Sequence, residues 1–230
     1  MHMWLRRYVR HIVTRFAVLV CLVSAGLAGA LRPLGAAGSD LNTLLKGVEQ
    51  RYNHAKTLEV QFTESYSVQG RARKSESGDL TLRKPGRMFW NYTAPAGKFF
   101  LSDGKDVYLY TPDTHQVQKT KLKASDDMRA PLAFLLGKLD FGKEFRDFSL
   151  KAEGGNFVIA AKAKTDQLQY DKIEMLITQD YEIRRLVVNG QDQSVLTFQF
   201  ENEKLNPAVN DALFKFQTPE GATVVDEGGA

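Results

Sequence analysis

The segment Gly78–Pro95 constrains the fold more than any other part of the chain. On both sides of Lys84-Pro85-Gly86-Arg87, apolar residues alternate with polar ones, so each side has a period of two. This is the period of a β-strand with one apolar face. Pro-Gly favours a type II turn, because proline presets φ and glycine accepts the positive φ that follows. The segment therefore predicts a β-hairpin whose apolar residues share one face.

The same period recurs along most of the chain, between short turn sequences such as Asp103-Gly104 and Gly154-Gly155. Besides the hairpin, the expected strands are Leu58–Val68, Lys98–Leu101, Val107–Tyr110, Gln116–Lys121, Phe148–Ala152, Phe157–Ala163, Tyr170–Thr178, Ile183–Asn189 and Val195–Phe200. Ala212–Phe216 is expected to form a last strand or a turn. The pattern predicts about 11 antiparallel strands in all.

Two segments have helical spacing instead. Asp40–His54 is amphipathic, and Ser125–Leu139 predicts one short helix or two, followed by a loop over Asp140–Glu144. A long antiparallel sheet tends to curl, because closure removes its exposed edges. We therefore expect a mainly β (α+β) fold, an incomplete, curled antiparallel β-barrel covered by an N-terminal helix and a helical lid.

The N-terminus has the features of an export signal. Four arginines between positions 6 and 15 precede the apolar run Phe16–Leu31, which is short for a membrane span. Small residues allow cleavage after Ala30 or Ala37, and we favour Ala37, with an uncleaved anchor as the alternative. The expected organisation is a signal peptide over residues 1–37 and a single domain over residues 38–230.

The net charge of the chain is different once the predicted signal peptide is set aside. The whole chain has 31 basic and 27 acidic residues, and residues 1–37 hold five of the basic ones and no acidic one, which leaves 26 against 27. A net charge of −1 gives no reason to expect nucleic-acid binding. Cys21, the one cysteine, follows Leu19-Val20, which does not match a lipidation signal. Export without disulfides favours a bacterial periplasm.

We find no pattern typical of catalysis. His54 and His115 have no second histidine or cysteine at ligand spacing, so no metal site is expected. G-x-S-x-G is absent, and Gly154-Gly155 lacks the spacing of a phosphate loop. The sequence therefore predicts no enzyme and no cofactor.

Large apolar side chains are concentrated on the strand faces. Most of this apolar surface comes from the aromatic residues Trp90, Tyr92, Phe99, Phe100, Tyr108, Tyr110, Phe157, Tyr170, Phe198 and Phe200. They form either an ordinary sandwich core or, on one strongly curved sheet with few helices, the lining of a pocket for an apolar ligand. Composition alone leaves both interpretations open.

At Gly78–Pro95 the sequence G-D-L-x-L-x-K-P-G-R-x-x-W-x-Y-x-x-P, followed by Ser102–Lys105 and Val107–Tyr110, resembles the outer-membrane lipoprotein carrier (LolA) family. Further matching segments are Ala130–Leu136, Asn206-Pro207, Leu213–Phe216 and Pro219–Gly221. The resemblance covers essentially the whole chain after the signal peptide.

The resemblance implies an incomplete barrel with a hydrophobic cavity, in a monomeric periplasmic chaperone. Such carriers receive acylated lipoproteins from an inner-membrane ABC transporter and deliver them to an outer-membrane receptor. The alternative is an envelope lipid- or glycolipid-binding or sensor protein on the same fold.

The resemblance also suggests site residues. The expected cargo cavity is lined by Leu80, Leu82, Met88, Trp90, Tyr92, Phe99, Tyr108 and Phe198. The expected lid consists of Pro131, Leu132, Phe134, Leu135 and Leu136. The expected latch for that lid is Lys84 with Arg83 or Arg87. The family usually has arginine at the position of Lys84, and lysine lacks the planar donor fork of arginine, so a different latch is expected here.

Overall fold

The computed structural model describes residues 37–122, 139–165 and 170–226. All of these belong to the unit Ala37–Ala230, into which the chain divides after Ala36. The predicted signal peptide lies outside the described residues except for Ala37, so its cleavage stays a prediction. The five predicted lid residues, within Pro131–Leu136, also lie outside them.

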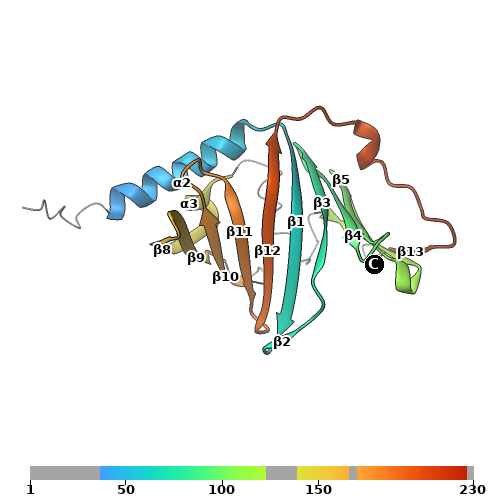
Figure 1. Ribbon diagram of the computed structural model, residues 1–230. Coiled ribbons are helices and arrows are strands. Elements are labelled where there is room, and N and C mark those ends of the chain that lie inside the picture. Colours follow the sequence, from blue (N-terminus) through green and yellow to red (C-terminus); the bar gives the residue numbers. More distant parts are fainter. Residues whose placement is uncertain (1–36, 123–138, 166–169, 227–230) are drawn as a thin grey trace, which may run out of the picture. The chain divides into compact units, whose positions relative to one another are not determined.

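One open, curled sheet organises the described residues (Figure 1). The strands of its first half are β1 (Thr57–Val68), β2 (Arg71–Ala72), β3 (Glu76–Arg83), β4 (Arg87–Ala94), β5 (Phe99–Asp103), β6 (Asp106–Thr111) and β7 (Gln116–Lys121). Those of its second half are β8 (Phe145–Glu153), β9 (Asn156–Ala163), β10 (Tyr170–Ile177), β11 (Ile183–Gly190), β12 (Ser194–Leu205) and β13 (Thr223–Asp226). The incomplete barrel is confirmed.

The order of the strands explains why the sheet is open. It runs β13-β7-β6-β5-β4-β3-β1-β12-β11-β10-β9-β8, with β2 paired to β1, so β13 and β8 lie at opposite ends. Pairing of β1 with β12 joins the two halves at the centre. All pairs are antiparallel except β13–β7, which is parallel.

The hairpin that the sequence predicts is β3–β4, with Leu80 opposite Trp90 and Leu82 opposite Met88. In its turn Gly86 adopts the predicted positive φ, of 71°, and the Lys84–Pro85 peptide is cis.

Three local predictions are corrected. The described sheet has 13 strands rather than about 11, since β2 and β13 are too short to show an alternation in the sequence. Asp211–Phe214 forms the 3-10 helix η4, where a strand or turn was expected, and Asn210 caps it by accepting from the Ala212 N–H. Phe141–Glu144 forms the short helix α3 rather than a loop, because Asp140 caps its start. A further 3-10 turn, η1, spans Pro112–Thr114.

Helix α2 (Ala37–His54) confirms the predicted N-terminal helix and crosses one side of the sheet (Figure 1). Leu44, Val48 and Tyr52, spaced one helical turn apart, are buried in the main hydrophobic core. Arg51 in the last turn places positive charge where the helix dipole favours it. The helix therefore covers the apolar face with its own apolar stripe.

Candidate functional site

The side of the sheet that packs against α2 is a continuous apolar surface, which we call the inner face. Its central residues are Leu58, Val60, Phe62, Leu80, Leu82, Met88, Trp90, Tyr92, Phe198 and Phe200, all buried. At its centre the ring centroid of Trp90 lies 4.7 Å from that of Phe62 and 5.2 Å from that of Phe198. Edge-on and tilted contacts of this kind stabilise aromatic clusters beyond simple burial.

The inner face brings together six of the eight residues predicted to contact a cargo, namely Leu80, Leu82, Met88, Trp90, Tyr92 and Phe198. They come from β3, β4 and β12, and each is at most 4% exposed. Their common face follows from the pleat, because residues two apart on a strand point to the same side. Their role toward a cargo stays a prediction.

The other two, Phe99 and Tyr108, do not lie on the inner face. They belong to a second cluster with Leu101, Tyr110 and Val117, on the opposite side of the sheet. There the ring of Phe216 stacks on Tyr108 with centroids 4.0 Å apart. Strands β5 and β6 are apolar on both faces, so alternation alone could not say which residues face inward. The strand pairing places Phe100 opposite Trp90 and so on the inner face.

The second half of the sheet contributes inner-face residues that were not proposed from the sequence as cargo contacts. Ile159, Ile173, Met175 and Val188 on β9, β10 and β11 are 0% exposed and belong to the same core. A period of two marks these strands in the sequence, but only the pairing shows that they continue the face of Trp90. The apolar surface therefore spans both halves of the sheet.

Glu64 places a carboxylate within this apolar surface. Glu64 on β1 is 8% exposed and accepts a hydrogen bond from the Tyr92 hydroxyl over 2.9 Å. The ammonium of Lys98 lies 4.4 Å from the centroid of the Tyr92 ring, and Lys98 also pairs with Glu76. Polar groups therefore lie on the inner face near those ends of β1 and β4 that are farthest from the Lys84 turn.

Lys84 ties the hairpin turn to helix α2. Its Nζ donates to the carbonyl oxygen of Tyr52 over 2.7 Å, and its backbone N–H donates to the Lys56 carbonyl over 2.9 Å. Burial lowers the pKa of the Lys84 ammonium, whereas the carbonyl end of a helix favours a cation. The predicted contact of Lys84 with the lid concerns residues that the structure does not describe and stays a prediction.

Arg83 and Arg87 fasten a different segment. Both guanidinium groups pair with Asp211 at the start of η4, with 2.9 Å between Arg87 Nη1 and Asp211 Oδ1. Arg87 also lies over the ring of the buried Phe214, 5.8 Å from its centroid. The Asp211 side chain is 60% exposed, so each ion pair contributes modestly. Their described contacts hold the C-terminal segment against the hairpin.

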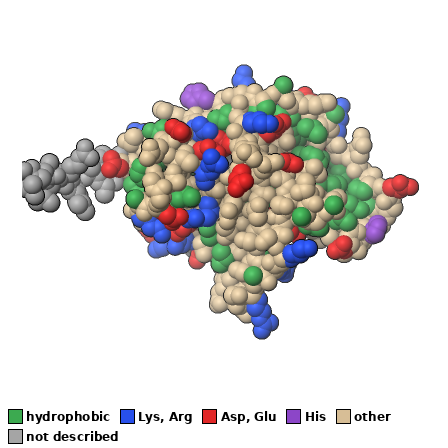
Figure 2. Space-filling model, in the orientation of Figure 1, with side chains coloured by type: hydrophobic (Ala, Val, Ile, Leu, Met, Phe, Trp, Pro, Cys, Tyr) green, Lys and Arg blue, Asp and Glu red, His purple; other side chains and the backbone are tan. Residues whose placement is uncertain are grey.

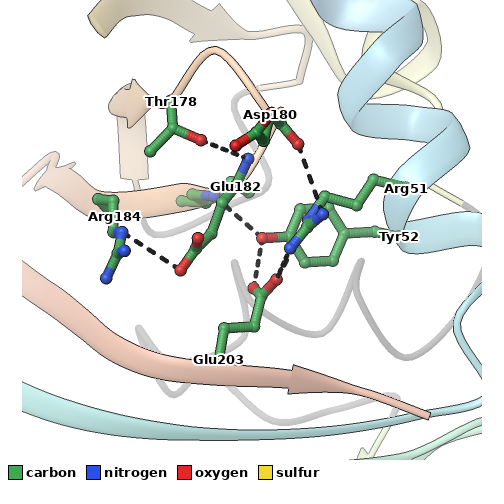
Figure 3. Close-up of polar contacts among 8 residues, drawn as sticks. Arg51, Tyr52, Thr178, Asp180, Glu182, Arg184 and Glu203 are labelled. Carbon is green, nitrogen blue, oxygen red and sulfur yellow. Dashed lines mark hydrogen bonds and ion pairs between the residues drawn. The ribbon is translucent and has the colours of Figure 1, made fainter.

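A buried carboxylate fixes the end of α2 to the sheet (Figure 3). Glu203 on β12 accepts from Arg51 Nη2 over 2.6 Å and from the Tyr52 hydroxyl over 2.7 Å. The same hydroxyl accepts from the Ile183 N–H over 3.0 Å. Burial and the Glu203 charge hold the pKa of Tyr52 well above its usual value. Helix α2 is therefore attached to both β11 and β12.

Helix α2 also binds Leu139 and Phe141, at the start of the described range 139–165. The Asn53 side-chain amide donates to the Leu139 carbonyl over 2.8 Å and accepts from the Leu139 N–H over 2.7 Å. Glu49 accepts from the Phe141 N–H over 2.8 Å. These three hydrogen bonds fix the point that follows the predicted lid.

A small apolar pocket lies between α2 and the hairpin. It has a volume of about 10 Å³ and is lined by Tyr52, Ala55, Lys56, Thr57, Leu58, Leu82 and Lys84. This space is too small for an acyl chain, so a chain could enter there only if α2 or the hairpin moved.

Two further properties concern only residues 37–122, 139–165 and 170–226. Within these ranges no three histidine, cysteine or carboxylate side chains gather as metal ligands would. Nor does any helix in them combine the length and the apolar character needed to cross a membrane.

A curled open sheet with an apolar inner face under a helix is suited to holding an apolar ligand. The family model described as outer membrane lipoprotein carrier protein LolA matches residues 53–217, and this chain belongs to that family. The resemblance seen at Gly78–Pro95 is thereby confirmed. The family consists of carriers rather than enzymes.

The chain is similar along most of its length to named members of the family. An outer-membrane lipoprotein carrier protein of Pseudomonas putida is 28% identical, over 92% of this chain and 99% of the relative. One from Pseudomonas fluorescens is 31% identical over 75% and 84%. One from Salmonella paratyphi A is 26% identical over 87% and 97%.

Two of the solved structures to which this chain is similar are more distant in sequence. A LolA superfamily protein from Nitrosomonas europaea is 9% identical, with a TM-score of 0.44 over 76% of this chain and 97% of the other. An uncharacterized conserved protein from Thermus thermophilus is 14% identical, with a TM-score of 0.48 over 82% and 99%.

Proposed function

We propose that this protein is a periplasmic chaperone that carries lipoproteins from the inner to the outer membrane with their acyl chains against the inner face. The observation that carries this proposal is the continuous apolar surface centred on Trp90, in a chain that belongs to the lipoprotein carrier family. An inner-membrane ABC transporter would load the carrier, and an outer-membrane receptor would unload it.

The energetics favour such a carrier. A buried methylene is worth about 0.8 kcal/mol, so a chain of about fifteen costs on the order of 12 kcal/mol to leave in water. Unassisted transfer across an aqueous space is therefore very slow. A surface nearly as apolar as the bilayer makes each transfer close to isoenergetic, so that small differences in affinity set its direction.

The buried state of the inner face implies that the carrier must open to bind its cargo. Trp90 and Phe198 are 0% exposed, and Met88 is 1% exposed. Acyl chains can reach these side chains only if a covering element moves away. We propose that the lid over Pro131–Leu136 is that element, and that Lys84 belongs to its latch together with Arg83 or Arg87.

The signal peptide supports the proposed location. Export followed by cleavage near Ala37 would release a soluble monomer with a net charge close to zero. Without the predicted signal peptide the sequence has no cysteine, which favours a soluble carrier over a receptor anchored by a lipidated cysteine.

The decisive experiment incubates the purified protein with spheroplasts or membrane vesicles that carry radiolabelled lipoproteins. We expect acylated lipoproteins to appear in a soluble complex with this protein. A mutant lipoprotein without its acylated cysteine serves as the control and should not be captured. Equal capture of both forms would overturn the proposal, whereas copurification of glycolipids alone would favour the lipid-binding alternative.

A further inference from the structure

A basic protrusion extends from the end of the sheet where β1 and β2 meet (Figure 1). It consists of the β1–β2 hairpin and the residues that follow it, Val68–Lys74. Between Ser65 and Ser75 there are three basic residues, Arg71, Arg73 and Lys74, and no acidic one. Figure 2 shows Lys and Arg side chains at this lower tip of the molecule.

The protrusion is an ordered turn. Gln69 and Gly70 both have positive φ, of 49° and 77°, and β1 pairs with β2 through Val68 opposite Arg71. Two central residues with positive φ are typical of a type I′ turn, which matches the twist of a two-stranded hairpin. The Gln69 N–H donates to the Gln193 carbonyl over 3.3 Å, so the neighbouring β11–β12 turn braces it. The cations are therefore held at a defined place.

Their charge is not neutralised by the fold. All three side chains are exposed, and within the described ranges none forms an ion pair with a carboxylate. Arg73 instead lies over the Tyr66 ring, 4.9 Å from its centroid. The closest acidic residues along the chain, Glu64 and Glu76, are bonded to Tyr92 and Lys98. Asp192 lies on the β11–β12 turn that braces the protrusion, and its negative charge opposes the three cations.

From this arrangement we infer that the protrusion is a contact site for anionic phospholipid headgroups at a membrane surface. The domain without its signal peptide has a net charge near zero, so the molecule as a whole is not attracted. Three unpaired cations at one projecting tip would orient it toward a negatively charged surface. The site needs no cargo, so this inference goes beyond the proposed function and does not depend on it.

The expected attraction is weak and reversible. Each basic residue close to an anionic membrane surface raises binding about fivefold, so three give on the order of 100-fold, less the opposing effect of Asp192. The attraction falls off within a Debye length of about 8 Å at physiological salt. It therefore acts only on charges that come this close to the membrane, as those at a projecting tip can. A carrier that must also leave the membrane benefits from such short-lived contact.

The test measures binding of the cargo-free protein, purified from the periplasm, to protein-free vesicles. Vesicles of phosphatidylcholine alone are compared with vesicles that also contain phosphatidylglycerol, by co-sedimentation at low and at physiological salt. We expect binding only to the anionic vesicles, weakened by salt. The Arg71→Gln/Lys74→Gln variant should bind the anionic vesicles about 25-fold more weakly.

A matched control removes the same charge elsewhere. Lys46→Gln/Lys151→Gln alters two exposed lysines on α2 and β8, away from the end of the sheet that carries the protrusion. This control should bind like the wild type. Equal loss in both variants would overturn the inference, because it would mean attraction by overall charge rather than by the tip.

A label provides the second readout. Because Cys21 lies in the predicted signal peptide, Gln69→Cys gives a single cysteine for an environment-sensitive dye, and Asp113→Cys on η1 serves as a distant control. Anionic vesicles should change the emission at position 69 and not at 113. No change at 69, or a change only with vesicles that contain inner-membrane proteins, would overturn the inference, and the latter would indicate an acidic protein partner instead.

Discussion

At the scale of single residues, Glu203 attaches the end of α2 to the sheet. Its side chain is 4% exposed and accepts from both Arg51 and Tyr52. Glu203→Gln keeps the shape but removes the charge and turns one acceptor into a donor, so we expect a loss of about 1–3 kcal/mol in the free energy of unfolding. Urea denaturation measures it.

Glu201→Gln is the matched control, because Glu201 is exposed on the same strand. It should change stability by less than about 0.5 kcal/mol. Similar losses in the two variants would mean that the bonds of Glu203 do not hold the helix.

The pKa of Glu182 leads to a prediction of how the stability of the protein depends on pH. Burial and the nearby Glu203 charge raise the pKa of Glu182, although Arg184 Nε lies 3.2 Å from its Oε1. With a raised pKa the folded state holds this proton more tightly than the unfolded state. The contribution of Glu182 to stability is therefore fully present below its unfolded pKa and is lost as pH rises through the raised value.

Glu182→Gln should therefore flatten the decline in stability from the ordinary carboxyl pKa upward. Urea unfolding of wild type and variant at a series of pH values checks this expectation. Parallel pH profiles for the two proteins would contradict it.

At the scale of elements, the β3–β4 hairpin depends on the absence of a side chain at Gly78. A Cβ there would lie 2.1 Å from the Asn91 carbonyl oxygen and 2.8 Å from the Tyr92 Cα, both backbone atoms that cannot rotate away. The strand register also shifts between Ser77 and Gly78. Gly78→Ala should therefore cost more than about 2 kcal/mol of stability.

Gly142→Ala is the control for that substitution. Its Cβ would meet only the Asp140 Oδ1, at 3.6 Å, an ordinary contact. Thermal unfolding of the two variants measures the contrast. A tolerated Gly78→Ala would show that β3 and β4 separate more readily at this point than the structure indicates.

At the scale of the whole molecule, Trp90 reports on the inner face. The chain has two tryptophans, and Trp4 lies in the predicted signal peptide, so Trp90 would be the only fluorophore of its kind in the exported protein. It is 0% exposed. We expect weak quenching by acrylamide in the empty protein, and a change in emission when a lipopeptide with acyl chains binds.

The same peptide without acyl chains should leave the emission unchanged. A response to both peptides would place the binding elsewhere than on the inner face.

Much of this fold could be predicted from the sequence, because alternation is a local property. The period of two around Gly78–Pro95 fixed the hairpin, and α2 followed from its own apolar stripe. The same rule failed at β5 and β6, where both faces are apolar and Phe99 and Phe100 are equally good candidates for the interior. Only the pairing of Phe100 with Trp90 assigns the faces.

The sequence by itself determined the class of fold, the family and the common face of six of the eight residues proposed to contact a cargo, because each depends on patterns within a few residues. Tertiary structure alone decided what depends on distant segments. The positive φ of Asn202, 56°, interrupts the alternation on β12, and Glu203 after it bonds to α2. Likewise, Lys84 binds the end of α2, and Arg83 and Arg87 bind Asp211, more than 100 residues away in sequence. No local pattern records such partners, because burial and charge complementarity choose them only once the sheet has curled.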